Sequence, residues 1–163
     1  MIKINRSGFL IFRKKKYKCV LGKNGITDKK IEGDFCTPKG NFRIIKIYYR
    51  SDKIKKFQTK IPLIKIKKNM GWCDDPRSNK YNRLIRLPFK YRYEPMYRRN
   101  GIYDIVGVLN YNYNYVKKNK GSAIFLHISK KNYEKTKGCI ALKKKDLIKI
   151  LSTMRSNEVI KVQ

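Results

Sequence analysis

The sequence predicts a mainly β fold, a sandwich or barrel, with one helix in its C-terminal half. Short segments of alternating apolar and polar residues follow one another along the chain and are separated by turn residues. Only one stretch repeats its apolar residues at helical spacing. The 163 residues include 12 Tyr and 7 Phe, and aromatic side chains favour strands. The length fits a single domain covering residues 1–163.

The predicted strands are short and are divided by recognisable turns. The Asn-Gly pair at residues 24–25 marks one tight turn, and the Pro and Gly of residues 37–40 mark another. Residues 41–49 alternate with a slip in register near Ile45. The complete set of predicted strands comprises residues 1–5, 8–13, 17–21, 41–49, 61–66, 104–109, 123–128 and 159–162.

Two segments depart from the strand pattern. Residues 144–155 predict the helix, although Lys143 and Lys144 are unfavourable near the positive end of a helix dipole and only Asp146 favours it. Residues 69–81 show no period and contain the sequence Gly-Trp-Cys-Asp-Asp-Pro. We interpret this stretch as a long irregular loop of the kind that often carries function.

The charge of the chain is strongly positive, with 42 Lys and Arg against 11 Asp and Glu and a net charge of +31. Such a field attracts anionic polymers of any kind, including nucleic acid, anionic lipid and acidic wall polymers. The Lys residues are scattered rather than gathered in one arm, which favours a compositional bias. We therefore expect nonspecific attraction to anionic polymers and no specific nucleic-acid partner.

The cysteines and the single histidine restrict the kinds of site available. The four Cys residues form no Cys-x-x-Cys pair, and nothing in their spacing selects a disulfide pairing. With one His in the chain, a mixed Cys/His metal site is not expected. We predict no metal and no organic cofactor.

The N-terminal sequence bears on localisation. The apolar run at residues 9–12 is too short for the core of a signal peptide, and no small-residue cleavage site follows it. No stretch is long and apolar enough to be a transmembrane segment. As written, the product is expected in the cytoplasm as a monomer. A misassigned start codon or a non-standard export route would place it in the periplasm instead.

The histidine and one cysteine suggest nucleophilic catalysis. His127 ends an apolar strand, and Gly138-Cys139 follows twelve residues later. A Cys and a His at the ends of adjacent elements can form a thiolate–imidazole pair. The backbone N–H groups near Gly138 and Cys139 could bind an oxyanion, and the following helix would favour a thiolate. The alternative is a small buried Cys and a structural His.

Two segments resemble the catalytic signature of the L,D-transpeptidase (YkuD-type) family, which has a His on a strand followed by Ser/Thr-x-Gly-Cys. They are Gly121-Ser-Ala-Ile-Phe-Leu-His127 and Thr136-Lys-Gly-Cys139-Ile-Ala-Leu. Other stretches are similar to a short bacterial subgroup that lacks a signal peptide: Glu32-Gly-Asp with Thr37-Pro-x-Gly-x-Phe42, Trp72-Cys-Asp-Asp-Pro76 with Tyr81-Asn82, and Tyr103-Asp104. The resemblance covers about residues 17–152.

The resemblance implies a β-sandwich or barrel whose one helix follows the catalytic Cys. It also implies a reaction on peptidoglycan stem peptides. Cys139 would be the nucleophile that forms a thioester, and His127 would be the general base and acid. The backbone carbonyl of Ile128 would orient the His, Gly138 and Cys139 would supply oxyanion contacts, and Thr136 would shape the loop that binds substrate.

The chain also departs from the family pattern near these residues. Many members have Gly where this chain has Ile128, and many have Arg where it has Ala141. The usual Arg recognises the substrate carboxylate, so this part of substrate recognition does not carry over to this chain, and the sequence does not decide which residue would replace the Arg. Lys137, Arg83 and Arg86 are the candidates.

The irregular stretch and its surroundings supply further candidates for the substrate groove. The alternative for these residues is a well-packed loop, with the Trp as a core anchor and the Asp-Pro pair as turn chemistry. The candidates are Trp72, Asp74, Asp75, Tyr81, Asn82, Arg43 and Arg86.

Three functions are compatible with the sequence. The first is an L,D-transpeptidase that cross-links stem peptides, and the second is an L,D-carboxypeptidase that hydrolyses their terminal D-amino acid with the same site. The third is a non-catalytic basic module that binds a polymer. Catalysis requires the Cys139 sulfur and a His127 ring nitrogen within about hydrogen-bonding reach or slightly beyond, in an open groove. Side chains on opposite faces would exclude it.

Overall fold

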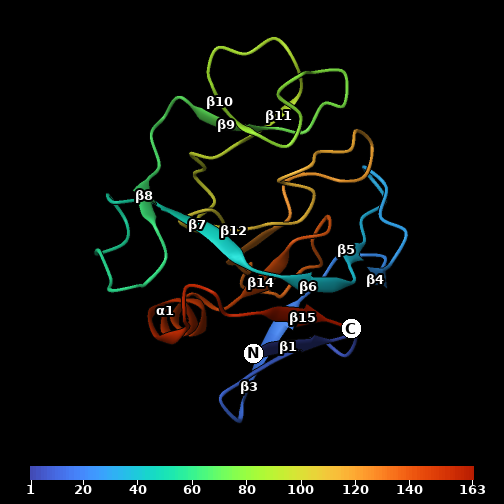
Figure 1. Ribbon diagram of the computed structural model, residues 1–163. Helices are drawn as coiled ribbons and strands as arrows, with labels where there is room; N and C mark the ends of the chain where they lie inside the picture. The colour runs from blue at the N-terminus through green and yellow to red at the C-terminus, as the bar shows by residue number, and fades with distance from the viewer.

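The computed structural model describes residues 1–163 and is built around one ten-stranded, curled sheet (Figure 1). The strand order is β6-β15-β1-β2-β3-β14-β13-β12-β7-β8. The elements of this sheet are β1 (Ile2–Asn5), β2 (Phe9–Phe12), β3 (Lys15–Val20), β6 (Gly40–Phe42), β7 (Ile44–Tyr49), β8 (Leu63–Lys65), β12 (Ile105–Leu109), β13 (Phe125–Ile128), β14 (Ile140–Leu142) and β15 (Ile160–Val162).

Two smaller sheets and one helix complete the fold. The order β10-β9-β11 forms a three-stranded sheet, and β4 pairs with β5. Their bounds are β4 (Ile26–Thr27), β5 (Thr37–Pro38), β9 (Met70–Cys73), β10 (Leu84–Arg86) and β11 (Tyr93–Pro95). The helix α1 (Lys144–Thr153) follows β14. The mainly β architecture with one helix near the C-terminus is confirmed.

The curl of the large sheet follows from one short connection. The predicted strand at residues 41–49 is divided into β6 and β7, and only Arg43 lies between them. Yet β6 is at one end of the strand order and β7 is next to the other end. Strands joined by one residue must lie close together, so the two ends of the sheet approach each other. The predicted slip in register near Ile45 is a bulge within β7, because Val108 pairs with Lys46 and Leu109 with Ile44.

The stretch predicted to be an irregular loop contains a strand. Residues Met70–Cys73 form β9, the centre of the three-stranded sheet, where Trp72 pairs with Leu84 on one side and Glu94 on the other. Gly71, Trp72 and Cys73 are all buried, so no alternation of polar and apolar residues marks the strand. Three buried residues in a row are expected for a strand covered on both faces. The prediction of a loop over residues 69–81 is therefore wrong for its first half.

The helix begins at Lys144, as predicted, and ends two residues early, at Thr153. Its N-cap residue, Lys143, makes no side-chain cap hydrogen bond, and Asp146 is the only acid in the first turn. The helix is therefore held by packing rather than by capping, since Leu147, Ile150 and Leu151 are buried. It is neither long nor apolar enough to cross a membrane.

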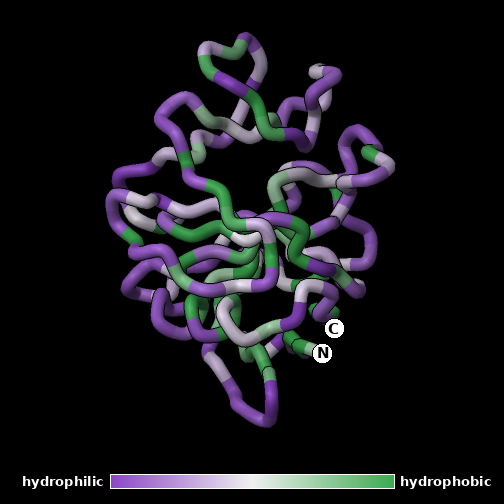
Figure 2. Tube along the Cα trace, turned by 60° about the vertical axis from the view of Figure 1, so that its left-hand side comes forward, coloured by the Kyte–Doolittle hydropathy of each residue, from purple (hydrophilic) through white to green (hydrophobic).

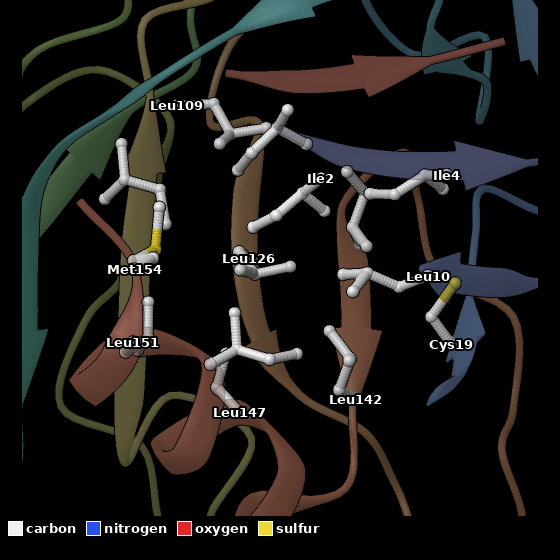
Figure 3. Close-up of a cluster of buried hydrophobic side chains, with 14 of the residues drawn as sticks. Ile2, Ile4, Leu10, Cys19, Leu109, Leu126, Leu142, Leu147, Leu151 and Met154 are labelled. Atoms are coloured by element: carbon white, nitrogen blue, oxygen red, sulfur yellow. The ribbon is translucent and has the colours of Figure 1, made fainter. Parts of the chain in front are cut away.

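Two hydrophobic cores lie on the two faces of the central strands. In the larger core, Leu126 and Leu142 of the sheet face Leu147 and Leu151 of the helix (Figure 3). The smaller core joins Val106, Val108 and Phe125 to residues of the three-stranded sheet and its flanking loops. Figure 2 shows the apolar residues concentrated in the middle of the molecule and the hydrophilic ones in the outer loops. The central strands are therefore fixed from both sides.

Candidate active site

His127 occupies the middle of the sheet. It lies on β13, paired with Val106 of β12 on one side and with Ala141 of the parallel strand β14 on the other. The side chain is buried, with 6% exposed. Both neighbouring strands are fully hydrogen-bonded elements of the central sheet, so the position of the imidazole is set by the fold rather than by a loop.

Cys139 lies immediately before β14, two residues ahead of Ala141. Because side chains alternate along a strand, Cys139 lies on the same face as Ala141 and therefore as His127. The contacts agree, since Cys139 packs against the smaller core together with Phe125, whereas Ile140 belongs to the larger core. The two side chains therefore share one face of the sheet and do not lie on opposite faces, the arrangement that would have excluded catalysis.

The imidazole is oriented by the next residue of its own strand. Nδ1 of His127 lies 2.9 Å from the carbonyl oxygen of Ile128. A carbonyl oxygen can only accept a hydrogen bond, so Nδ1 carries the hydrogen and Nε2 has the free lone pair. Ile128 stands where many members of the resembling family have Gly, yet the contact is made by the backbone and does not depend on the side chain.

The thiol of Cys139 is held by the backbone that precedes β13. Its sulfur donates to the carbonyl oxygen of Ala123 at 3.0 Å and accepts the N–H of Phe125 at 3.4 Å. Burial raises the pKa of Cys139 to about 12, although the Phe125 N–H opposes this shift. Burial also lowers the pKa of His127 to about 4, and the charge of Arg98 acts in the same direction.

In this structure the burial of Cys139 and His127 favours the neutral form of each over the thiolate–imidazole pair that the sequence suggests. Both groups are buried, and burial disfavours the charged form of each. The predicted help from the helix dipole is also absent, because strand β14 separates Cys139 from the first residue of α1. The resting pair is a neutral thiol and a neutral imidazole.

Asn82 fixes the backbone that receives the thiol. Its side-chain oxygen accepts the N–H of Ala123 at 3.0 Å and the indole N–H of Trp72 at 2.9 Å. Its amide nitrogen donates to the carbonyl of Asn112 at 2.6 Å. Ala123 has φ of 50°, a left-handed conformation that is unfavourable for a residue with a side chain. Asn82 therefore helps to hold a strained turn whose carbonyl faces the Cys139 sulfur.

A tight turn presents Cys139. The hydroxyl of Thr136 donates to the carbonyl of Cys139 at 2.6 Å and accepts the N–H of Gly138 at 3.1 Å. Gly138 has φ of 133°, and a Cβ added there would lie 2.8 Å from the carbonyl oxygen of Cys36. The space beside Gly138 is thus filled by the loop that contains Cys36, and the Gly138 N–H, predicted as an oxyanion contact, already donates to Thr136.

The predicted groove residues are mostly buried supports. Trp72, Tyr81 and Asn82 are each 2% exposed, so they form a wall behind the site and do not line a groove. Trp72 packs edge-on against Phe125 at 5.2 Å between ring centroids. The core-anchor alternative is correct for Trp72. The reason is chemical, because the indole N–H finds its acceptor inside the protein, on Asn82.

Half of the charged candidates are held by other parts of the protein. Asp74 binds Arg92, and Asp75 holds Arg77 through two side-chain contacts. Arg83 donates to the carbonyl oxygens of Asn82 and Tyr113 and so supports the wall. The remaining candidates, Arg43, Arg86 and Lys137, are exposed, and their side chains form no hydrogen bond or ion pair.

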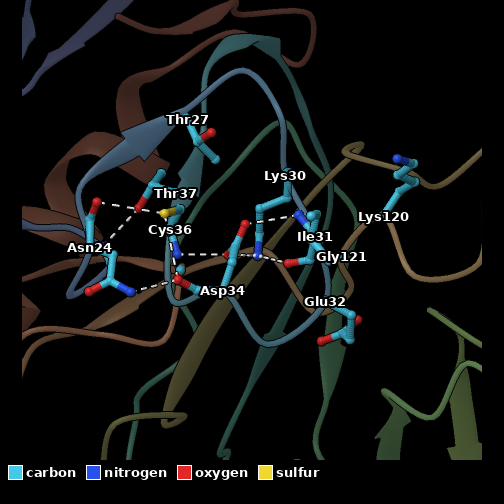
Figure 4. A network of polar contacts seen from close by, with 12 residues as sticks. Asn24, Thr27, Lys30, Ile31, Glu32, Asp34, Cys36, Thr37, Lys120 and Gly121 are labelled. Atoms are coloured by element: carbon cyan, nitrogen blue, oxygen red, sulfur yellow. Dashed lines mark hydrogen bonds and ion pairs between the residues drawn. The ribbon is translucent and has the colours of Figure 1, made fainter.

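A polar network lies beside the Cys139 turn (Figure 4). The ammonium of Lys30 is buried and pairs with Asp34, and Asp34 accepts the backbone N–H of Cys36 at 2.8 Å. Glu32 accepts the hydroxyl groups of Tyr81 and Ser122. The network fixes the loop that closes against Gly138, and it explains why the hydroxyl of Tyr81 faces the interior.

Three residues beside Cys139 and His127 were not predicted from the sequence to belong to the site. Tyr103 meets the His127 ring edge-on, with 5.4 Å between ring centroids. The guanidinium of Arg98 lies 4.4 Å from the centre of the Tyr103 ring and forms an ion pair with Glu94. The sequence around Tyr103 contributes to the family resemblance but does not indicate a role for this residue in the site. No local pattern distinguishes Arg98 from the other basic residues of this chain.

The described residues contain no group of three or more His, Cys, Asp and Glu side chains arranged to hold a metal ion, and all four cysteines are free. The chemistry available at this site is therefore that of a thiol, an imidazole and backbone dipoles. This set is sufficient for acyl transfer.

The comparison with known families agrees with this geometry. The model of the L,D-transpeptidase catalytic domain (YkuD) matches residues 2–162, nearly the whole chain. No curated protein matches the sequence. The match includes both strands that carry the pair, the turn that presents the thiol and the helix that follows. The chain belongs to the L,D-transpeptidase catalytic domain family.

Proposed function

We propose that this protein is a cysteine-dependent acyltransferase that acts on peptidoglycan stem peptides through a thioester at Cys139. The observation that carries the proposal is that His127 on β13 and Cys139, immediately before the parallel neighbour β14, lie on the same face of the sheet. The orientation of the imidazole adds to it, because Nε2 is the nitrogen left free to receive a proton. The family to which the chain belongs acts on peptidoglycan.

Because the Cys139 thiol and the His127 imidazole are both neutral at rest, the first step must include transfer of the thiol proton. Nε2 of His127 takes the thiol proton while the sulfur attacks the carbonyl carbon of the scissile amide, so that the C–S bond forms as the S–H bond breaks. The negative charge develops on the carbonyl oxygen. Because the N–H of Gly138 is bonded to Thr136, we assign the N–H of Cys139 as the oxyanion donor.

The second step releases the amine and leaves the acyl group on sulfur. The C–N bond breaks as imidazolium returns its proton to the departing nitrogen, which restores a neutral His127. An acceptor amine or water then attacks the thioester and gives its proton to His127, the C–S bond breaks, and the imidazolium returns the proton to the leaving sulfur to restore the thiol. Transfer to an amine is transpeptidation, and transfer to water is hydrolysis of the terminal D-amino acid.

Arg98 is our candidate for the group that recognises the substrate carboxylate, the role left open by Ala141. Its charge acts on both members of the pair, since it lowers the pKa of His127 and of Cys139. Its side chain is 23% exposed and stacks on Tyr103, so the planar guanidinium is held in place but accessible. A guanidinium binds a carboxylate through two parallel hydrogen bonds.

The reaction is tested by incubation with a disaccharide tetrapeptide, with and without an acceptor peptide. We expect mass spectrometry to show an acyl adduct on wild-type protein and none on Cys139→Ala. Release of the terminal residue alone indicates hydrolysis, and formation of a dimer indicates transpeptidation. Cys36→Ala is the matched control, because Cys36 lies on the neighbouring loop and should leave the adduct unchanged. Full activity of Cys139→Ala would refute the mechanism.

A further inference from the structure

A basic hollow is lined mainly by residues of β3 and by residues at the start of α1. These two elements lie at the end of the molecule opposite β9, β10 and β11 (Figure 1). Its volume is about 580 Å³. Six of its nine lining residues are lysines, whereas Lys and Arg together account for 42 of the 163 residues of the chain. The basic composition alone does not explain this concentration. The lining residues are Lys15, Lys16, Tyr17, Lys18, Tyr133, Lys143, Lys145, Asp146 and Lys149. We call this site the lysine hollow.

The lysines come from two elements that face one another. Three of them lie along β3, where successive residues are about 3.3 Å apart. Two of those on the helix, Lys145 and Lys149, are one turn apart and therefore on the same side. A ligand in the hollow would thus be met by ammonium groups from both walls.

The charge of the hollow is not neutralised within the protein. The ion pairs of the chain that involve lysine use Lys30, Lys53 and Lys130, and none belongs to the hollow. Asp146 is the only acid in the lining, and it forms no ion pair. Six like charges repel one another in one hollow, so a bound anion would relieve that repulsion.

The start of α1 adds to the positive field. Lys143, at the N-cap, provides no side-chain hydrogen bond to the first turn. The free backbone N–H groups of a helix N-terminus and the helix dipole both favour an anion. In this protein the N-terminus of α1 lies among the lysines of the hollow. The helix N-terminus and the lysine charges therefore favour an anion in the same space.

The aromatic rings of the hollow argue against a nucleic-acid base as the main feature recognised. The ammonium of Lys18 lies 4.3 Å from the centre of the Tyr133 ring, and that of Lys143 lies 5.6 Å from it. Tyr17 is half-buried and packs against the larger core. These rings fix lysines and support the sheet instead of offering an open stacking surface. Recognition in the hollow therefore depends on charge.

We propose that the lysine hollow binds a ligand with two or more closely spaced phosphate groups, either free in solution or presented as a lipid headgroup. Phosphate groups carry the highest charge density among common biological anions, and lysines bind them as mobile point charges. The proposal does not depend on the thioester chemistry, because the hollow contains neither Cys139 nor His127. Binding is therefore expected to persist in Cys139→Ala.

Two triple variants of the full chain test the proposal. Lys15→Gln, Lys145→Gln and Lys149→Gln together remove three charges from the hollow and leave the two lysines over Tyr133 in place. Lys55→Gln, Lys56→Gln and Lys60→Gln remove the same charge from an exposed loop elsewhere. All six side chains are exposed and unpaired, so both variants should fold. Binding of inorganic tripolyphosphate and of orthophosphate is measured by calorimetry.

The proposal expects tripolyphosphate to bind better than orthophosphate, and the hollow variant to lose at least about tenfold in affinity. The loop variant should lose less than about threefold, as expected from the overall field alone. Equal losses in the two variants, or no preference for tripolyphosphate, would overturn it. Sedimentation with cardiolipin vesicles separates the two sources: a loss confined to the hollow variant assigns a lipid headgroup, and no vesicle binding assigns a soluble ligand.

Discussion

The thiol of Cys139 donates its hydrogen bond to the carbonyl oxygen of Ala123, 3.0 Å away. Ala123 reaches this position in a left-handed conformation, with its own N–H bound to Asn82. The Cys139 thiol is therefore hydrogen-bonded to the backbone, and the proposed attack by its sulfur requires this bond to break. This relationship makes the turn around Ala123 as important for reactivity as the histidine.

The role of Asn82 can be tested by truncation. Asn82→Ala removes the acceptor of the Ala123 and Trp72 N–H groups and the donor to Asn112. We expect the free energy of unfolding to fall by about 3 kcal/mol, and the rate of acyl-enzyme formation to fall with it. The matched control is Asn119→Ala. Asn82 and Asn119 both have a left-handed backbone conformation, with φ of 64° at Asn119, but Asn119 is exposed and has no side-chain hydrogen bond. Comparable losses in both variants would show that only the backbone conformation matters.

The acid limb of the pH profile should report His127. Its pKa is lowered to about 4, and only the neutral imidazole can accept the thiol proton. The rate of acylation should therefore stay constant from neutral pH to about pH 5 and fall as the pH passes through about 4. The measurement is the initial rate of adduct formation at pH values where circular dichroism shows folded protein. A limb near pH 6.5, the ordinary value for His, would contradict the burial argument.

Alkylation distinguishes the cysteines. Burial raises the pKa of Cys139 to about 12, so almost no thiolate exists at neutral pH. Cys36 is partly exposed on its loop. We expect iodoacetamide to modify Cys36 well before Cys139 at pH 7.5, and the rate at Cys139 to keep rising with pH beyond 9. Peptide mass spectrometry reads both sites in one sample. Rapid labelling of Cys139 at neutral pH would mean that the thiolate exists at rest.

Gly138 should tolerate no side chain. In Gly138→Ala the new Cβ would meet the Cys36 carbonyl oxygen at 2.8 Å, in a conformation unfavourable for alanine. We expect about 2 kcal/mol or more of lost stability and a strong loss of acylation. Gly33→Ala is the comparison, because Gly33 also has positive φ, at 79°, but no atom within 4 Å. It should cost only about 1 kcal/mol and leave acylation intact.

Arg98 should affect substrate binding more than the chemical step. Arg98→Lys keeps a charge but loses the planar fork and its stacking on Tyr103. We expect KM for a stem peptide with a free terminal carboxylate to rise about tenfold, with a smaller change in kcat, and little change for the amidated peptide. Arg99→Lys, at the exposed neighbouring position, serves as the control. An equal effect on both peptides would remove Arg98 from carboxylate recognition.

The fold was predictable where each strand shows its own pattern. Alternation or a run of apolar residues located the strands of the large sheet other than β14, and helical spacing located α1. Strand β9 was missed because Gly71, Trp72 and Cys73 are all buried between partners that only the tertiary structure supplies. A three-residue strand such as β14 cannot be recognised from its sequence either, because only its pairing with β13 and β3 defines it.

The site was predictable to a smaller extent. The order of His127 and Cys139 in the chain pointed to their pairing, and the structure places both on one face. The protonation state was not predictable, because it depends on burial, which sequence spacing does not report. The Ala123 carbonyl has no sequence signature either, since every residue has a backbone oxygen. Trp72, Tyr81 and Asn82 were predicted as groove residues, but each is buried, and this burial depends on tertiary packing that sequence spacing does not report.

The pairing of the first and last strands has a consequence for synthesis. Ile2 pairs with Ile160 and Ile4 with Val162, and β15 is also the strand to which β6 is bonded. Because β15 follows every other strand in the chain, the sheet can close only after residues 160–162 have left the ribosome. Contacts this distant in sequence also form late, since they close the longest loops. A nascent chain that stalls before these residues therefore exposes unpaired edges of β1 and β6, which are sites for a chaperone or for aggregation.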